Sequence, residues 1–345
     1  MIDVAVIGAG PAGCAASIAL ARTGQQVVLL DRADAPRESV CGEFLGADTM
    51  RLLRDIGVDP VALGAVPILG MRAGAGRREA ASALPFAAFG LPRRVLDGAL
   101  REAAEAAGAH LATGRIVQGI RRERDGWLIE GVALRAARVV LATGKHALRG
   151  HPRAAPMGPV GIKLHLDGLD LPPEVALLRF EGGYAGLQPG PDGRANLCAA
   201  LTGRVPADAA AMLARVAAGS ELAKRLLRGA KPAWPRPLAV AGVPYGFVQK
   251  GGVAGIYRVG DQLSVIPSFV GDGMAMALAS GLAAADAIAA GQASAEFHAA
   301  WARRTARQMR VARGGAWLMR AMPRLFIVAV GSPAATLAMR ATRMR

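Results

Sequence analysis

The residues whose types and spacing point to chemistry begin with three glycines near the start of the chain. Gly8, Gly10 and Gly13 follow a short apolar run at residues 2–7 and open a stretch typical of a helix. In that context the first glycine permits a tight turn, the second lets the backbone approach a pyrophosphate, and the third lets helix and strand pack closely. The positive end of the helix favours the pyrophosphate charge. The pattern predicts a dinucleotide site.

An acidic residue stands where such a site needs one. Asp31 ends the next apolar run, residues 26–30, and lies eighteen positions after Gly13. A carboxylate at the end of this strand accepts hydrogen bonds from the ribose hydroxyls of a dinucleotide. The adjoining residues expected in the same site are Pro11, Ala12 and Arg32.

Later segments favour a flavin over a nicotinamide cofactor. Residues 138–144 and 257–261 each read as a strand that ends in a small-residue turn, and the segment PSFVGDGM then leads into a small-residue helix. Asp261 would hold the ribityl hydroxyls, and the helix beginning near Gly273 would direct its N–H groups at the pyrimidine edge of the flavin, which gains negative charge on reduction. The cofactor residues expected here are Thr143, Gly144, Gly260, Asp261, Gly271, Gly273 and Met274.

Together these motifs resemble a known family. The order GxGxxG, Asp31, CGE, RxxxD, ATG, GD and PxxxGDGM is similar to the FAD-dependent oxidoreductases of the geranylgeranyl-reductase type, within the p-hydroxybenzoate hydroxylase superfamily, over roughly residues 1–300. The resemblance implies that the first fingerprint binds the ADP half of FAD, that Arg93 opens a helix beside the FAD, and that Val117 lies near the adenine. A solvated helix start is the alternative for Arg93.

The loop at residues 37–45 carries the candidates for catalysis. The resemblance implies that Cys41 and Gly42 lie against the flavin and that Glu43 lies near the substrate. Burial there would raise the pKa of the Glu43 carboxyl, which suits a general acid or base. The alternative is that Cys41 is a small buried hydrophobe and Glu43 a ligand within the loop.

A substrate pocket is expected on the middle part of the chain. Tyr184 and Gln188 lie four residues apart on one expected strand and therefore face the same side. His165 alternates with Lys163 on another strand. The expected pocket residues are His165, Tyr184, Gln188, Trp234 and Tyr245, with Asn196 as a further neighbour and an ordinary role in the sheet as the alternative. The histidines show no metal-ligand spacing, so no metal site is expected.

The sequence leaves the reaction open between three hypotheses. The leading one is a monooxygenase that hydroxylates a lipophilic aromatic or polyketide-like molecule through a flavin hydroperoxide, because the CGEF and GDGMAMAL segments resemble those of hydroxylases. The second is a reductase that saturates isoprenoid double bonds with a proton from Glu43 or Cys41. The third is a flavin electron-transfer protein that docks at a membrane.

Two motifs of related flavin enzymes are missing from the sequence, which limits the possible electron source and reaction. Residues 142–146 read ATGKH where the aromatic hydroxylases carry an Asp-Gly motif that contacts FAD and NADPH. The electron source is therefore either NAD(P)H or a separate electron-donor protein. The WxWxIP segment of flavin halogenases is also missing, which argues against halogenation.

The elements that must position these residues form an α/β fold. The resemblance implies a Rossmann-like FAD-binding lobe, an inserted antiparallel β-sheet substrate lobe and a C-terminal helical tail. The expected boundaries are 1–65, 93–150 and 255–300 for the FAD-binding lobe, 66–92 and 151–254 for the substrate lobe, and 301–345 for the tail. Residues 66–92, rich in Gly, Ala and Pro, are expected to form a crossover into the substrate lobe.

Composition excludes several classes of protein. The 345 residues are 52% hydrophobic and 20% charged, which excludes a disordered chain. Three cysteines exclude a disulfide scaffold and fit a reducing compartment. No basic segment precedes the first apolar run, so we expect no signal peptide and a cytoplasmic protein.

Positive charge is concentrated in the tail. The net charge is +16, and residues 297–345 contain ten arginines and no Asp or Glu. Such a surface suggests an anionic partner, and the low aromatic content of 4% favours a peripheral membrane surface over nucleic acid. The apolar run at 325–339 would span ~22 Å as a straight helix, short of the ~30 Å hydrocarbon core. It is expected to lie in the interface or to cap a lipophilic tunnel, the alternative being a helix packed on the FAD-binding lobe.

Overall fold

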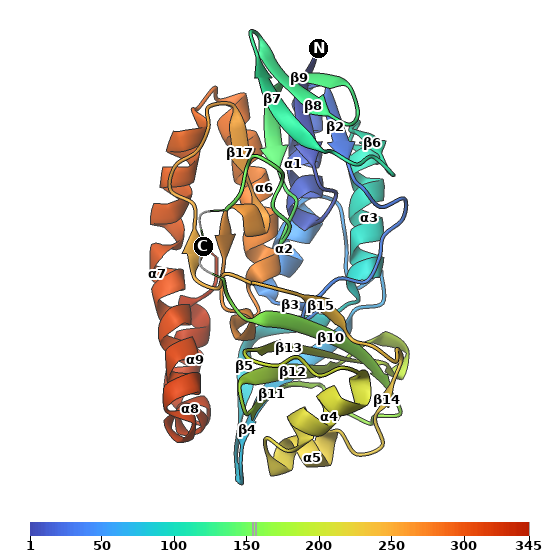
Figure 1. Ribbon diagram of the computed structural model, residues 1–345. Coiled ribbons are helices and arrows are strands. Elements are labelled where there is room, and N and C mark those ends of the chain that lie inside the picture. Colours follow the sequence, from blue (N-terminus) through green and yellow to red (C-terminus); the bar gives the residue numbers. More distant parts are fainter. Residues whose placement is uncertain (154, 156, 345) are drawn as a thin grey trace.

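The computed structural model describes residues 1–153, 155 and 157–344, so that Ala154, Pro156 and Arg345 lie outside the described part of the chain. Two lobes lie end to end, and a column of helices from the C-terminal part of the chain runs along one side of both (Figure 1). The first lobe contains the glycine turn, and the second contains the larger of the two main sheets.

The first lobe is built on a sheet in the order β6-β2-β1-β9-β8-β7, and β17 also pairs with β9. Its strands are β1 (Ile2–Ile7), β2 (Val27–Leu30), β6 (His110–Ala112), β7 (Gly119–Glu123), β8 (Gly126–Glu130), β9 (Leu134–Leu141) and β17 (Ile256–Arg258). The pairs β2–β6, β1–β2, β1–β9 and β9–β17 are parallel. Parallel strands are buried on both faces, which explains the unbroken apolar runs read in the sequence.

The helices α1 (Pro11–Arg22) and α3 (Arg93–Ala106) pack on this sheet. Two further helices, α2 (Ala47–Asp55) and α6 (Gly273–Ala289), lie outside them, with α6 packed on α1 and α2 packed on α6. Gly281 lets α6 approach α1, since a Cβ atom at this position would lie 2.2 Å from the Ala12 carbonyl oxygen. The first residues of both helices, Pro11 and Gly273, border the same cavity.

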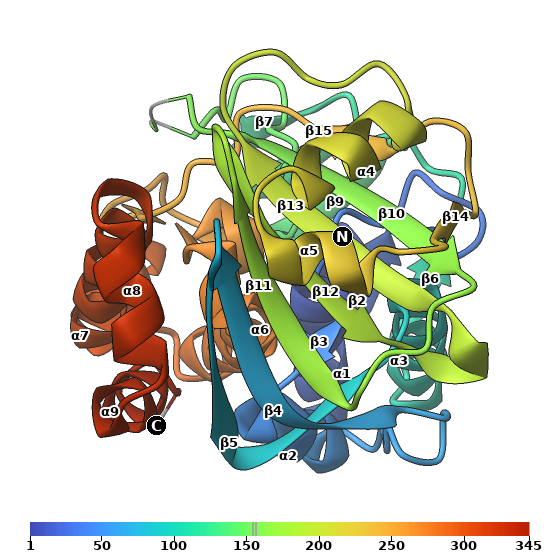
Figure 2. The same cartoon turned by 90° about the horizontal axis from the view of Figure 1, so that it is seen from below.

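The second lobe is a mainly antiparallel sheet in the order β14-β10-β13-β12-β11-β4-β5-β3, and β15 also pairs with β10. Its strands are β3 (Phe44–Leu45), β4 (Val66–Ala75), β5 (Arg78–Gly90), β10 (Val160–Asp167), β11 (Glu174–Phe180), β12 (Gly183–Pro189), β13 (Ala195–Leu201), β14 (Lys231–Pro232) and β15 (Leu238–Val240). The helices α4 (Ala209–Ala217) and α5 (Glu221–Leu226) cover one face of this sheet (Figure 2). The other face is turned toward the first lobe (Figure 1).

The expected crossover at residues 66–92 is wrong, because this segment forms the long hairpin of β4 and β5. Side-chain exposure alternates along the first half of β5, as in a half-buried strand. The hydropathy of the sequence does not show this alternation, because alanine occupies both exposed and partly buried positions. Strand pairing places this hairpin in the second sheet, because β4 pairs in parallel with β11 and the C-terminal end of β5 pairs with β3. The short strand β3 therefore belongs to the second sheet although its residues fall within the expected range 1–65.

The tail consists of three helices, α7 (Ser294–Ala321), α8 (Pro323–Val330) and α9 (Pro333–Ala341). Pro323 begins a new helix, and the apolar run that follows is bent by 92° between α8 and α9 and is not a straight helix. Among the described residues no single helix combines the length and hydropathy needed to cross a membrane, and α8 and α9 meet that test only when taken together. α8 packs on β4 and β5 of the second lobe. The strands β16 (Phe247–Val248) and β18 (Ser264–Val265) form a small separate sheet.

Candidate active site

A cavity of about 1210 Å³ lies between the lobes and continues beneath the tail helices. It begins at the glycine turn after β1, passes the loop at residues 37–45, and ends against α8 and α9. Every cofactor residue expected from the sequence lines this cavity except Gly13. A Cβ atom at Gly13 would lie 1.9 Å from the Gly8 carbonyl oxygen, so this glycine permits close packing.

The glycine turn leaves room for a pyrophosphate. Gly8 has a φ of +108°, and a Cβ atom there would lie 2.4 Å from the Ala142 carbonyl oxygen. No side chain caps the first N–H groups of α1, which begins just after Gly10. A Cβ atom at Gly10 would meet nothing nearer than the Arg93 guanidinium at 3.9 Å. Free N–H donors, open space and a guanidinium group fit the diphosphate of FAD.

Asp31 is held in place at the end of β2. The Ala9 N–H donates to one carboxylate oxygen at 2.8 Å, and the Ala33 N–H donates to the other at 2.8 Å. The guanidinium of Arg101 lies 3.4 Å from the second oxygen. The carboxylate is thus oriented in the cavity wall, where ribose hydroxyls can donate to its remaining lone pairs.

Arg93 opens α3 but is not a solvated helix start. Its side chain is largely buried and makes two hydrogen bonds of 2.9 Å to the Asp97 carboxylate. Burial lowers the pKa of Arg93, but the charges of Asp97 and Cys41 and the hydrogen bonds to them together outweigh burial and keep this pKa above its usual range. The guanidinium therefore stays charged beside the glycine turn.

The opposite end of the cofactor region is formed by the turns after β9 and β17. Lys145 lies 3.1 Å from the Asp261 carboxylate, whose charge raises the pKa of this lysine. The Arg153 guanidinium donates to the Asp261 and Lys145 carbonyl oxygens at 2.9 and 2.7 Å and so connects the two turns. Sequence reasoning missed Lys145 and Arg153, because Asp261, which both of them contact, lies far away along the chain.

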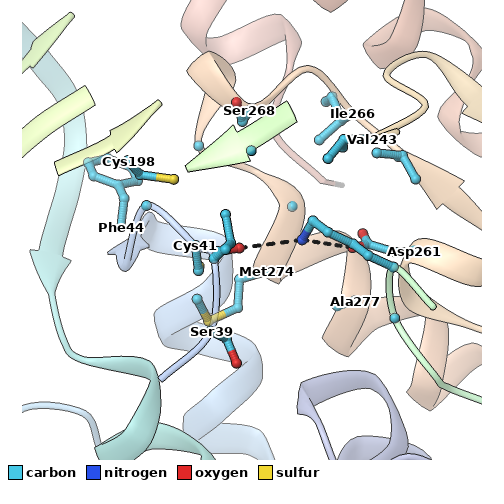
Figure 3. Close-up of a pocket in the computed structure, with 18 of the residues that line it drawn as sticks. Ser39, Cys41, Phe44, Cys198, Val243, Asp261, Ile266, Ser268, Met274 and Ala277 are labelled. Atoms are coloured by element: carbon cyan, nitrogen blue, oxygen red, sulfur yellow. Dashed lines mark hydrogen bonds and ion pairs between the residues drawn. The ribbon is translucent and has the colours of Figure 1, made fainter. Parts of the chain in front are cut away.

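The N-terminus of α6 faces the same space. Gly271, Gly273 and Met274 line the cavity, and a Cβ atom at Gly273 would have no neighbour within 4 Å. No side chain caps the first turn of this helix. Cys41 and Met274 lie on the opposite side of the pocket from Asp261, with Cys198 and Phe44 on another side (Figure 3). The Lys145 ammonium group connects the two sides, at 3.5 Å from the Val40 carbonyl oxygen and 3.1 Å from the Asp261 carboxylate. These residues could hold a flavin ring, and the free N–H groups at the start of α6 would then stabilise negative charge on its pyrimidine edge.

The loop at residues 37–45 is fastened by a cluster that we call the loop clamp, formed by Glu38, Glu43, Lys163 and His165. The Lys163 ammonium group donates to Glu43 at 2.5 Å and to Glu38 at 2.6 Å, and His165 Nε2 lies 3.0 Å from the second oxygen of Glu43. Lys163 and Glu43 are almost fully buried. The loop also bends here, since Glu43 has a φ of +58°.

Amide side chains hold the backbone of the same loop. Asn196 donates to the Cys41 and Gly42 carbonyl oxygens at 3.2 and 2.8 Å, and Gln188 donates to the Glu43 carbonyl oxygen at 3.1 Å. The strand register places His165 opposite Asn196, and Asn196 opposite Gln188. The three side chains thus form a row across β10, β13 and β12 that supports Cys41.

The expected rise in the pKa of Glu43 is wrong. Burial does raise this pKa, but the hydrogen bond from His165 and the charge of Lys163 outweigh burial and bring it below its ordinary value. Glu43 is therefore held as a carboxylate at neutral pH, which makes it a poor proton donor. In the described part of the chain, ligand atoms of Glu38, Glu43 and His165 lie within 4.8 Å of one another, as for a metal ion. The Lys163 ammonium group already occupies the cation position against both carboxylates.

The expected pocket residues divide into two groups. Tyr184, Gln188 and Tyr245 line the cavity, whereas His165 and Trp234 do not. Trp234 lies against His165 with ring centroids 5.0 Å apart, so it supports the loop clamp. A strand pattern shows which residues share a face, but it does not show how far along that face the cavity extends.

Two tyrosines and a serine form a polar spot in the cavity wall. The hydroxyl groups of Tyr184 and Tyr245 lie 2.6 and 2.8 Å from the Ser268 hydroxyl oxygen. Burial raises the pKa of Tyr184 to about 12 and also raises that of Tyr245. Both phenols therefore remain neutral hydrogen-bonding groups at physiological pH.

Beyond this spot the cavity becomes apolar. Its floor on β12 and β13 is formed by small residues, with Gly186 opposite Cys198. The walls of this apolar extension are formed by Met71, Leu84, Phe86, Leu177 and Phe269 together with Leu318, Phe326 and Val330 from the tail. The tail thus closes one end of the cavity, as one of the sequence hypotheses expected.

The C-terminal residues reach back to α6. Arg343 forms a buried ion pair with Asp272, the residue that precedes α6, and donates to the Val270 carbonyl oxygen at 2.9 Å. Its guanidinium also lies over the Phe86 ring at 4.3 Å. Burial raises the pKa of Asp272 to about 7 although the charge of Arg343 opposes this shift. Nothing in the sequence pattern pointed to this pair.

Comparison with known proteins agrees with this geometry. Residues 1–131 match the family model described as FAD binding domain. The flavin-dependent brominase Bmp2 is 18% identical, with a TM-score of 0.80 over 100% of this chain and 94% of that chain. A geranylgeranyl bacteriochlorophyll reductase-like protein from Thermoplasma acidophilum is also 18% identical, with a TM-score of 0.74 over 98% and 95% of the two chains. At 18% identity, these similarities show a shared fold and do not by themselves indicate a shared activity.

Fold and site together define a flavoprotein that binds FAD. The match of residues 1–131 to an FAD binding domain and the lining of the cavity by the expected cofactor residues both agree with the FAD site that the motifs indicated.

Two curated relatives align with different shares of this chain. Menaquinone reductase of Mycolicibacterium smegmatis is 29% identical over 158 residues, which are 43% of this chain and 39% of that protein. The alignment therefore spans about two fifths of that relative. Digeranylgeranylglycerophospholipid reductase 2 of Methanopyrus kandleri is 29% identical over 329 residues, 86% of this chain and 80% of that protein.

Proposed function

We propose that this FAD-dependent oxidoreductase reduces carbon–carbon double bonds of an isoprenoid lipid. The observation that carries the proposal is the apolar extension of the cavity, which continues from the FAD-binding residues to α8 and α9. Walls of aliphatic and aromatic side chains accept a hydrocarbon chain and keep water away from the reacting centre.

The names of the curated relatives favour reduction over the hydroxylation that the sequence placed first. One relative is a menaquinone reductase, and the one that aligns over 86% of this chain is a digeranylgeranylglycerophospholipid reductase. Both names describe the reduction of a lipid. The proposed substrate class therefore combines a long isoprenoid chain with a polar head.

The side chains around the cavity have separate roles in this proposal. Bound FAD supplies the hydride for a two-electron reduction, and the protein supplies orientation and a proton. Cys41 lines the cavity on the loop that Asn196 supports, and it is our candidate proton donor. Glu43, fixed as a carboxylate, positions that loop instead. The hydroxyl groups of Tyr184 and Tyr245 are candidate contacts for the polar head.

A single product analysis tests the proposal. The FAD-loaded protein is reduced with dithionite, which removes the need to know its natural electron donor, and is mixed without oxygen with a geranylgeranylated glycerophospholipid. This lipid has no quinone ring, so any uptake of hydrogen occurs at its double bonds. We expect the lipid to gain pairs of hydrogen atoms by mass spectrometry while the visible flavin absorbance returns. An unchanged lipid mass and a flavin that stays reduced would contradict the proposal.

Hydroxylation of a lipophilic aromatic molecule is the second candidate. Phe44, Tyr184, Tyr245 and Phe269 also line the cavity, and aromatic side chains suit a flat ring. Repeating the reaction in the presence of oxygen, with aromatic polyketides as substrates, distinguishes the two candidates, because hydroxylation adds one oxygen atom to the product. A pure electron-transfer role has least support, since it does not need a cavity of this size.

A further inference from the structure

The outer side of the tail helices exposes large apolar side chains. We call the group formed by Trp317, Met322, Leu325, Val328 and Leu337 the tail patch. These side chains are 54%, 45%, 47%, 57% and 68% exposed, in that order. Other exposed large apolar residues of the described chain, such as Val61, Leu69 and Val205, are scattered over both lobes. A concentration of exposed apolar surface marks an interaction site.

The surroundings of the tail patch are positively charged. Among the described residues from 313 onward, the exposed arginines are Arg313, Arg320, Arg324 and Arg340. No Asp or Glu occurs from residue 297 onward. Apolar side chains bordered by arginines complement a surface that is apolar inside and anionic outside, which is the boundary of an anionic lipid bilayer.

The helices behind the tail patch form a single layer between solvent and the cavity. On α8, Phe326 and Val330 line the cavity, while Leu325 and Val328 are exposed. On α9, Ala338 and Met339 line the cavity, while Leu337 is exposed and is not part of the lining. These helices therefore carry apolar groups on both faces, although an ordinary surface helix is polar toward solvent.

We propose that the tail patch docks on the surface of an anionic lipid bilayer. The helices α8 and α9 have 8 and 9 residues and meet at 92°, so they suit burial in the interface rather than a crossing of the hydrocarbon core. Docking by this face places the cavity directly behind the lipid-facing helices. The docking itself does not depend on the reaction; only its use for substrate delivery rests on the proposed function.

Sedimentation with lipid vesicles tests the docking. We expect the FAD-loaded protein to bind vesicles of phosphatidylcholine and phosphatidylglycerol in equal parts, and to bind pure phosphatidylcholine vesicles at least about tenfold more weakly. The variant Leu325→Glu/Val328→Glu should lose about tenfold or more in affinity for the mixed vesicles, because two inserted aliphatic groups become charged. Arg320→Gln/Arg324→Gln should weaken binding and flatten its dependence on salt.

Matched variants on other surfaces serve as controls. Val61→Glu/Leu69→Glu introduces the same charges at side chains that are 47% and 64% exposed. Arg228→Gln/Arg236→Gln removes two exposed arginines near α4 and α5, away from the tail helices in Figure 1. All variants should retain FAD, measured by flavin absorbance.

Three results would overturn the proposal. One is equal binding by the Leu325→Glu/Val328→Glu variant and its control, and another is no binding of the unaltered protein to mixed vesicles. The third is a dimer in sedimentation equilibrium that only the tail-patch variants dissociate, which would assign the patch to a second copy of this chain. Because no turnover is measured, these results leave the proposed double-bond reduction to its own test.

Discussion

Lys163 is a buried charged residue. Its side chain is fully buried on β10, with Glu43 at 2.5 Å and Glu38 at 2.6 Å from the ammonium nitrogen. Burial lowers the pKa of Lys163, but the charge of Glu43 and the hydrogen bonds to both carboxylates outweigh burial and raise it. Removing one partner of such a group leaves an unpaired buried charge, which costs more than the intact pair contributes.

The variant Lys163→Met should therefore lower the free energy of unfolding by about 3–5 kcal/mol. Adding Glu43→Gln should recover part of this loss, because the double variant no longer buries the uncompensated Glu43 charge. Urea unfolding and flavin absorbance measure stability and FAD retention. Lys231→Met, at an exposed lysine on β14, is the control. Equal urea midpoints for Lys163→Met and its control would contradict the role of the loop clamp.

At the scale of elements, α7 is attached to the first lobe through a buried histidine. His298 Nε2 accepts the Arg258 N–H at 2.9 Å, and its other ring nitrogen lies 3.1 Å from the Gly251 carbonyl oxygen. Burial lowers the pKa of His298 from 6.5 to about 4. The helix is therefore held by a neutral imidazole, since a protonated ring has no lone pair to accept the Arg258 N–H.

This attachment predicts a loss of stability in mild acid. The pKa of His298 is lower in the folded than in the unfolded state, so the stabilisation is complete above pH 6.5 and decreases as the pH falls toward 4. The loss amounts to about 3 kcal/mol at most. Denaturant unfolding at a series of pH values measures it, and His298→Gln, which keeps one donor and one acceptor, should show a flatter curve between pH 4 and 6.5. Identical curves for both proteins would refute the prediction.

At the scale of the whole molecule, the cavity belongs to three parts of the chain at once. The first lobe contributes the glycine turns and the N-terminus of α6, the second lobe contributes the floor at Gly186, and the tail contributes Phe326 and Val330. No single part encloses this space. A substrate that fills it must contact all three parts, so blocking the floor should affect substrate binding without touching the FAD-binding residues.

The variant Gly186→Phe tests this arrangement. A Cβ atom at Gly186 would have one neighbour within 4 Å, the Cys198 carbonyl oxygen at 3.9 Å, so a larger side chain points into the cavity with little strain. We expect FAD retention to be unchanged and the spectral response of the flavin to a geranylgeranyl lipid to weaken about tenfold or more, because the added ring occupies the space. Gly251→Phe, on a loop with no neighbour within 4 Å of an added Cβ, is the control. An unchanged lipid response would show that the substrate does not cross this floor.

Some features of the protein were determined by residues close together in the sequence. The GAGPAG turn, Asp31 after β2 and the helix from Gly273 were all predicted correctly from local pattern. Each depends on local requirements: a glycine where no Cβ fits, an apolar run of strand length, or a break at a small-residue turn. Such requirements act between neighbours along the chain, so they can be read without the fold.

Other features were decided only by the tertiary structure. The row of His165, Asn196 and Gln188 under the loop, the hairpin of β4 and β5, and the pair of Asp272 with Arg343 join residues far apart in the sequence. Register and packing determine which distant side chains meet, and local periodicity carries no information about them. The pKa of Glu43 shows the consequence: burial alone predicts an increase, and the buried partners that reverse its direction, Lys163 and His165, lie 120 and 122 residues away.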